Sequence, residues 1–233
     1  MQYTRIVLNE PHASIEGLYD ERLSFWNIDE RFINDIVLKW TDWHTDYLFH
    51  GYKNVSIRTV RFPYSRFIVD AERLWNDPLE SVGQGILYKQ FDGYFREIPK
   101  VYKENLLNLW HWHQQRLISQ LYPDALLLDC HSFPSELSDV DICIGFNEDW
   151  SKPNKETIEL VVSLFENAGY KVGINEPYSN SETPNCSFAY QSMMLEVNKR
   201  AYMEPDSLRI KHHNIYKVSV RDVITKLLSE LGE

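Results

Sequence analysis

Six short runs of apolar and β-branched residues constrain the fold of this chain more than any other feature of its sequence. Their length and composition are typical of β-strands. The six predicted strands are TRIVLN (4–9), VSIRTV (55–60), ALLLD (125–129), VDICIGF (140–146), YKVGIN (170–175) and SMMLEV (192–197).

Segments with helical periodicity alternate with these runs. The clearest is C-terminal, where apolar residues recur at helical spacing at Val220, Val223, Ile224, Leu227, Leu228 and Leu231. A second helix is predicted after Pro153 with a stop signal at Gly169, a third spans about 99–121, and a fourth begins near Thr41. Strands separated by helices predict an α/β fold, with a mixed, mostly parallel sheet flanked by helices on both faces.

Composition narrows the class of protein. The 233 residues are 43% hydrophobic and contain no linker rich in Pro, Gly or Ser, so we expect one domain over residues 1–233. A net charge of -10 argues against nucleic acid or an acidic membrane as partner. No apolar run approaches the roughly 20 residues of a membrane span, and the N-terminus lacks a signal-peptide pattern. We therefore expect a soluble, cytoplasmic protein whose three cysteines are reduced thiols.

Two histidines follow predicted strands. His12 comes just after the first strand, and His131 follows ALLLD by two positions. Because ligands of such sheets bind at the carboxyl ends of the strands, both imidazoles are predicted to reach one edge. Glu196 lies inside an apolar run, which is a costly place for a carboxylate unless a cation or a reaction uses it. Asp42 is predicted in the first turn of its helix, on the same face as Asp46.

Seven blocks of the sequence carry a family resemblance. They are PHAS (11–14), TDWHTDYLF (41–49), YSRFIVDAER (64–73), DCHSFPSE (129–136), DICIGFN (141–147), PYS (177–179) and LEVNKRAYME (195–204). In this order they resemble the corresponding blocks of the N-formylglutamate amidohydrolase family, over roughly residues 8 to 205. That family is distantly similar to zinc carboxypeptidases and succinylglutamate desuccinylases. The resemblance therefore implies a zinc-carboxypeptidase-like fold with one zinc ion per chain.

The resemblance also implies roles for individual residues. It makes His12, Asp42 and His131 the metal ligands, with Glu16 as the alternative carboxylate. It makes Glu196 the catalytic glutamate. For the substrate it implies contacts from Arg66, Arg73, Tyr178 and Asn198, and Arg66 is also a candidate for stabilising a developing oxyanion.

The residue types fit one kind of chemistry. Zinc held by two imidazoles and a carboxylate keeps a position open for water, lowers the pKa of that water and polarises a carbonyl. An unligated carboxylate such as Glu196 can then take the proton of the water and return it to the leaving nitrogen. Asp129 could orient the site from behind the ligands. We predict a zinc-dependent amidohydrolase that cleaves a small N-acyl amino acid such as N-formylglutamate.

Three departures from the family pattern leave the substrate open. Ala13 and Ser14 replace a pair that usually ends in Gly, and Glu72 replaces an Asn beside the proposed carboxylate-binding arginines. After Pro177 the expected glycine-rich turn contains no glycine. These changes concern the substrate pocket more than the metal ligands.

Other interpretations stay open at this stage. The chain could be a non-catalytic relative that binds a metal or ligand, or a magnesium- or manganese-dependent phosphoesterase. The phosphoesterase would use Asp42, Asp46, Asp70 and Glu72. Arg66 and Arg73 could instead form structural ion pairs with Asp70 or Glu72. The oligomeric state and the native metal do not follow from the sequence.

Overall fold

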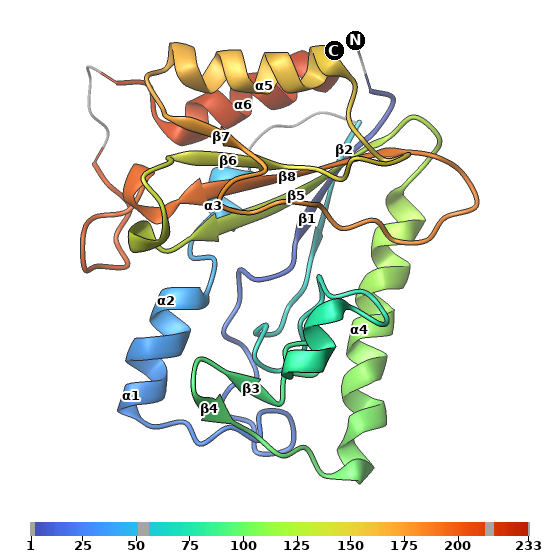
Figure 1. The fold of residues 1–233 in the computed structure, drawn as a ribbon, viewed down its shortest axis with the longest axis vertical. Helices are drawn as coiled ribbons and strands as arrows, with labels where there is room; N and C mark the ends of the chain where they lie inside the picture. Colours follow the sequence, from blue (N-terminus) through green and yellow to red (C-terminus); the bar gives the residue numbers. More distant parts are fainter. Residues whose placement is uncertain (1–2, 51–55, 213–216, 233) are drawn as a thin grey trace.

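The computed structural model describes residues 3–50, 56–212 and 217–232. Its main element is a six-stranded sheet with the strand order β2-β1-β5-β8-β6-β7 (Figure 1). The strands are β1 (Ile6–Glu10), β2 (Ile57–Arg61), β5 (Leu126–Phe133), β6 (Ile142–Gly145), β7 (Val172–Ile174) and β8 (Gln191–Asn198). Neighbouring strands run parallel except β6 and β8, which are antiparallel. The predicted mixed, mostly parallel sheet is confirmed.

All six predicted strands are present, with boundaries shifted by a few residues. Val55, at the start of the second prediction, lies outside the described residues. The largest difference is in β5, which continues to Phe133 because it pairs with β8 as far as Asn198. His131 therefore lies inside a strand, opposite Glu196, and the expectation that it follows the strand end was wrong.

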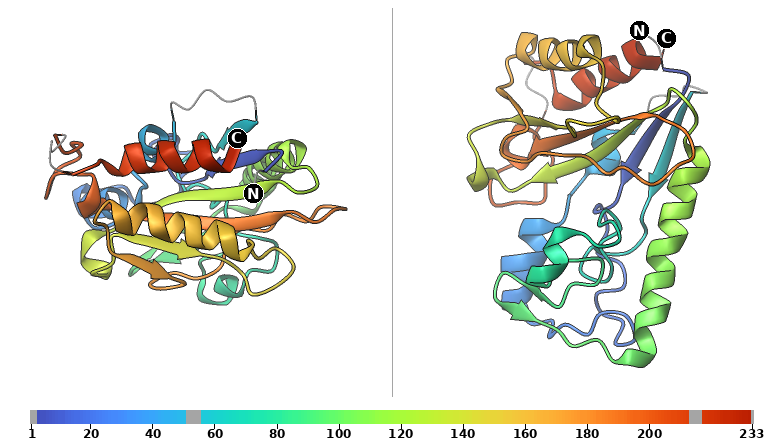
Figure 2. Two further views of the ribbon diagram at one scale, coloured as in Figure 1. Left: turned by 90° about the horizontal axis from the view of Figure 1, so that it is seen from above. Right: turned by 45° about the vertical axis from the view of Figure 1, so that its right-hand side comes forward.

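Helices cover both faces of the sheet. The three long predicted helices are confirmed as α4 (Lys100–Gln120), α5 (Lys155–Asn167) and α6 (Val220–Gly232). α5 and α6 lie side by side over one face, where Leu8 of β1 joins their shared core (Figures 1 and 2). Val7, the next residue along β1, belongs to a separate core with Leu117 of α4. The alternation of side chains along β1 thus joins the two layers.

Residues 13–43 and 62–98 form a smaller body on the side of the sheet opposite α5 and α6 (Figures 1 and 2). We call these two stretches the lower body. Between its two stretches, α3 (Thr45–Leu48) packs at the sheet, where Leu48 joins the core of α5 and α6. The elements of the lower body are α1 (Glu30–Phe32), a π-helical turn (Ile33–Val37), α2 (Leu38–Trp40), a 3-10 turn (Pro78–Val82), β3 (Gln90–Phe91) and β4 (Tyr94–Phe95). An aromatic core that includes Phe32, Phe67 and Tyr88 stabilises it. Its elements are short, and the sequence predicted a helix only near Thr41.

That helix does not begin where it was predicted. Thr41 has an extended backbone and His44 has a left-handed φ of 62°, so α3 starts only at Thr45. Asp42 consequently precedes the helix and is not in its first turn. It lies in a connecting segment, and its backbone N–H donates to the carbonyl of His12 at 3.1 Å.

Candidate active site

The sheet brings two distant histidines together. β1 and β5 are hydrogen-bonded neighbours, with Asn9 opposite Asp129, and this register carries both chains to the same edge. The rings of His12 and His131 lie with their centroids 5.0 Å apart, and both side chains are almost completely buried. The predicted convergence of the two imidazoles is confirmed.

Asp42 completes a three-residue group with these histidines. Its Oδ2 atom lies 2.9 Å from Nδ1 of His131 and 3.7 Å from Nδ1 of His12. The candidate ligand atoms of the three residues lie within 4.8 Å of one another, so the group could hold a metal ion. Within the described part of the chain, Nδ1 of His12 and Nε2 of His131 are buried and have no hydrogen-bond partner. Buried polar atoms are rarely left unpaired, so Nδ1 of His12, which faces Asp42, fits a metal ligand. In His131 the nitrogen beside Asp42 is Nδ1, and Nε2 lies 3.4 Å from Oε1 of Glu72.

The charges around the group also favour a cation. Burial opposes ionisation of Asp42, but the adjacent imidazoles of His12 and His131 outweigh it and lower the pKa of that carboxyl. Burial would lower the pKa of His131, but the carboxylates of Glu72, Asp42 and Glu196 together raise it to about 10. A positive charge is therefore stabilised at the centre of the site, and a divalent metal ion supplies such a charge.

Asp70 orients His12 from the lower body. Its Oδ1 atom lies 2.7 Å from Nε2 of His12, which leaves the other ring nitrogen facing Asp42. A carboxylate that holds the far nitrogen of a metal-binding histidine fixes the ring and its tautomer. Sequence reasoning considered Asp70 only as an ion-pair partner or phosphoesterase ligand. The signal for this role was weak, because the segment 64–73 has no regular secondary structure.

The two arginines are paired within the chain. Nη2 of Arg66 lies 3.3 Å from Oδ2 of Asp70 and donates to the hydroxyl of Tyr88 at 3.0 Å. Arg73 has Nη1 3.6 Å from Oε2 of Glu72 and Nε 3.8 Å from Oδ2 of Asp70. The interpretation of these arginines as ion-pair partners of Asp70 and Glu72 is thus confirmed.

Glu196 faces the same centre from β8. It is opposite His131 in the strand register, and its side chain is largely buried. Among the described residues its Oε2 atom has no hydrogen-bond partner. Burial raises the pKa of Glu196 to about 8, although His131 opposes the rise. A glutamate with this pKa gains or loses a proton easily near neutral pH.

Tyr178 lies near Glu196. Its pKa is raised by burial and then by Glu196, and its ring packs edge-on to Phe133 with centroids 5.7 Å apart.

Comparison with known proteins identifies the family of this chain. The family model described as N-formylglutamate amidohydrolase matches residues 5–203, which is most of the chain. The chain belongs to the N-formylglutamate amidohydrolase family. The family name refers to enzymes that hydrolyse amide bonds, and it implies a small-molecule substrate.

Two solved structures share the fold of this family member. One is N-formylglutamate amidohydrolase from Ralstonia eutropha JMP134, with a TM-score of 0.69 and 17% identity over 100% of this chain and 94% of that chain. The other is gene product Atu2144 from Agrobacterium tumefaciens, with a TM-score of 0.62 and 13% identity over 100% of this chain and 93% of that chain. A comparison with curated protein sequences gives no match.

Several residues singled out in the sequence lie outside the centre of this amidohydrolase-family site. Glu16 is exposed and is not part of the candidate metal group. Asp46 pairs with Arg61 at 3.3 Å, so the four carboxylates of the phosphoesterase interpretation are not assembled. The amide of Asn198 donates to the backbone carbonyls of Ser138 and Val140 and accepts from the N–H of Arg200.

Asp129 has a different role from the one predicted. Its carboxylate accepts from Nδ2 of Asn9 at 3.0 Å and from the backbone N–H of Glu182 at 2.6 Å, and among the described residues it makes no hydrogen bond to His12 or His131. Glu182, which the sequence did not single out, is buried and also accepts from Asn9, at 2.7 Å. Asp129 therefore anchors the glycine-free loop after Pro177 to the sheet edge, and burial raises the pKa of Asp129 to about 7.

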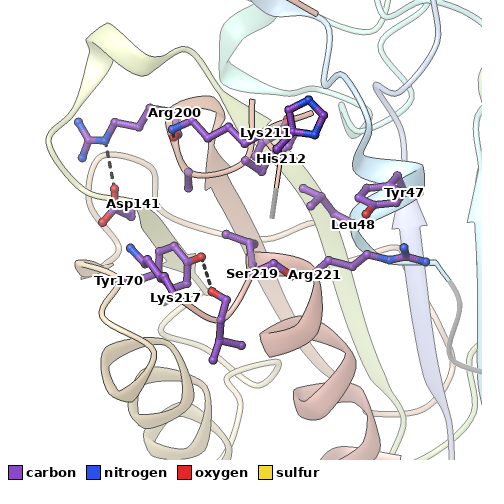
Figure 3. A pocket seen from close by; sticks show the side chains of 14 residues that line it. Tyr47, Leu48, Asp141, Tyr170, Arg200, Lys211, His212, Lys217, Ser219 and Arg221 are labelled. Atoms are coloured by element: carbon purple, nitrogen blue, oxygen red, sulfur yellow. Dashed lines mark hydrogen bonds and ion pairs between the residues drawn. The ribbon is translucent and has the colours of Figure 1, made fainter. Parts of the chain in front are cut away.

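A second pocket lies apart from this site. It has a volume of about 380 Å³ and is near the start of α6 (Figure 3). Its cationic side chains already have partners: Arg200 pairs with Asp141 at 3.1 Å, and Lys217 lies 3.8 Å from the centre of the Tyr170 ring. Because these charges are satisfied within the chain, we place the active site at the sheet edge.

The helices give one further finding about this family member. In the described parts of the chain, none of them is long and apolar enough to cross a membrane.

Proposed function

We propose that this chain is a zinc-dependent amidohydrolase that cleaves the amide bond of a small N-acyl amino acid. One observation carries the proposal: buried His12, Asp42 and His131 bring candidate ligand atoms within 4.8 Å of one another, beside Glu196, whose Oε2 atom has no hydrogen-bond partner among the described residues. In this proposal His12, Asp42 and His131 would hold the metal. A divalent ion bound there supplies a Lewis acid that polarises an amide carbonyl and acidifies water.

Glu196 is the proposed proton carrier. A nearby cation stabilises a carboxylate, so metal binding lowers the pKa of Glu196 below the value that burial alone gives. Its Oε2 atom, which no described residue engages, can take a proton from water and deliver it to the leaving nitrogen. A shuttle of this kind contributes roughly a hundredfold to ten-thousandfold to the rate.

Arg66 and Tyr178 are the proposed partners of the substrate. The Nε atom of Arg66 is buried and has no hydrogen-bond partner among the described residues, so its N–H is available to a substrate oxygen. Burial keeps the hydroxyl of Tyr178 protonated, so it can act as a neutral donor beside Glu196. Arg73 is held by Asp70 and Glu72, and we propose that it shapes the far side of the pocket.

The test is an assay of the zinc-reconstituted chain on a panel of N-formyl, N-acetyl and N-succinyl amino acids, with and without chelator. We expect turnover of at least one compound, loss of turnover with chelator, and recovery when zinc is restored. Stoichiometric zinc without turnover of any compound would contradict the proposal and support a non-catalytic, metal-binding relative.

A further inference from the structure

The arginines of the site carry no surplus positive charge. Arg66 and Arg73 are both within ion-pairing distance of Asp70, at 3.3 and 3.8 Å, and Arg73 also pairs with Glu72 at 3.6 Å. Two carboxylates thus match two guanidinium groups. The remaining carboxylates at the centre, Asp42 and Glu196, match the charge of a divalent ion.

Lys199 does not change the charge balance between the two arginines and their two carboxylates. It is the other buried cation near the centre, and its ammonium donates to the backbone carbonyl of Lys39. Burial also lowers the pKa of Lys199 to about 8. The positive charge of Arg73 is therefore already paired with Asp70 and Glu72 when a substrate carboxylate approaches it.

Glu72 is the carboxylate of this cluster that a substrate can meet. Its side chain is 17% exposed, whereas that of Asp70 is fully buried. Its Oε1 atom lies 3.4 Å from Nε2 of His131 and its Oε2 atom 3.8 Å from Nε2 of His12, so it borders the metal group and the arginines together. A like charge placed beside it is repelled, whereas an N–H donor can bond to it.

We propose that Glu72 determines substrate specificity, so that the site selects N-acyl substrates whose side chain presents an N–H donor and disfavours a side-chain carboxylate. The inference rests on the proposed amidohydrolase function and narrows its substrate class. On this account N-formylglutamine is a better substrate than N-formylglutamate. The two differ only at the end of the side chain, which is an amide in the first and a carboxylate in the second.

The test compares kcat/KM for N-formyl-L-glutamine and N-formyl-L-glutamate in the zinc-loaded wild type and in Glu72→Gln. A like-charge contact in a poorly solvated site predicts a wild-type preference for the glutamine compound of about 10- to 100-fold. Glu72→Gln, which keeps the size of the side chain, should remove most of that preference and retain one zinc per chain. Glu136→Gln is the matched control, because it removes an exposed carboxylate outside the cluster and should leave the preference unchanged.

The outcomes separate this inference from the proposed function. If no compound of the panel, these two included, is cleaved, the amidohydrolase proposal fails, and calorimetric titration of the two compounds into the same zinc-loaded chains still gives the preference directly. An equal or stronger preference for the glutamate compound in the wild type, by rate or by binding, would overturn the inference. Loss of zinc in Glu72→Gln would also overturn it, because Glu72 would then be a metal ligand.

Discussion

The sheet edge and the lower body contribute to the same site by different physical means. His131 and Glu196 are fixed by strand pairing, in which backbone hydrogen bonds set the register. Asp42 and Asp70 come from segments without long helices or strands, and packing around an aromatic core holds them. The sheet thus supplies positions that follow from periodicity, and the lower body supplies positions that depend on tertiary contacts.

This difference separates two tasks. The sheet edge carries groups that would bind the metal and move the proton, whereas the lower body surrounds them with the charges that orient His12 and pair the arginines. Changes at the sheet edge should therefore abolish metal binding or turnover. Changes in the lower body other than at the proposed ligand Asp42 should weaken metal binding or alter specificity without abolishing either.

The largest effect is expected for His131→Ala. Because the ~10–16 kcal/mol of a structural zinc site is shared among about four ligands, loss of one should weaken zinc binding on the order of 1,000-fold. Zinc per chain after dialysis should fall from about one to near zero, and turnover should disappear with it. His111→Ala is the control, because His111 is exposed on α4 and should leave the zinc content unchanged. Full zinc content in His131→Ala would show that the ion binds elsewhere.

Glu196→Gln should lose turnover and keep its metal. We expect kcat to fall by about 10²- to 10⁴-fold, the usual contribution of a general base. Zinc content measured on the same sample should stay near one per chain. Glu16→Gln serves as control and also tests the alternative ligand, since this exposed carboxylate should affect neither quantity. Unchanged turnover in Glu196→Gln would remove this residue from the mechanism.

His113 should make the metal-free protein sensitive to acid. It is buried with Nε2 2.9 Å from Oδ1 of Asn9, and burial lowers its pKa to about 3 from an ordinary 6.5. Between these values the unfolded chain binds more protons, so stability present above pH 6.5 is lost as the pH falls towards 3.

Urea unfolding at pH 7 and pH 4, with chelator present, measures this effect. Between pH 7 and pH 4 the free energy of unfolding of the wild type should fall by on the order of 3 kcal/mol more than that of His113→Gln, whose amide can still donate to Asn9. His111→Gln, on the exposed side of the same helix, should behave like the wild type. Equal acid sensitivity in the wild type and His113→Gln would contradict the buried neutral state of His113.

The smallest effect is expected in the lower body, for Asp70→Asn. An asparagine can still accept from His12, but the charge that polarises the imidazole is gone. Loss of such a supporting carboxylate typically weakens metal binding by about 10- to 100-fold. A zinc-competition titration with a fluorescent chelator measures the change. Asp46→Asn is the control, because Asp46 pairs with Arg61 and lies outside the metal group. Unchanged zinc affinity in Asp70→Asn would contradict the proposal that Asp70 supports the metal site.

The same contrast explains how much the sequence predicted. All six strands followed from short apolar and β-branched runs, and the long helices followed from helical spacing and helix boundary signals. The central strands β1 and β5 are buried throughout. The strand positions in turn placed His12, His131 and Glu196 at one edge. The sequence underestimated β5 because pairing with β8 extends it beyond Asp129 through the polar residues His131 and Ser132 to Phe133.

The lower body could not be predicted in this way. Its helices, turns and strands are at most five residues long, and no periodic pattern in the sequence identifies elements this short. Asp42 entered the candidate set through the family resemblance, and the helix predicted around it was wrong. The contact of Asp70 with His12 spans 58 positions and forms only when the body packs against the sheet. Glu182 was missed for the same reason, since its partners Asn9 and Gln114 come from β1 and α4.

The most direct test of the central claim is a crystal structure of the zinc-loaded protein, with anomalous scattering measured at the zinc edge. We predict one strong anomalous peak per chain, about 2.0–2.2 Å from a ring nitrogen of His12, a ring nitrogen of His131 and a carboxylate oxygen of Asp42. A peak bound to other side chains, with His12 and His131 free of metal, would contradict the proposed active site.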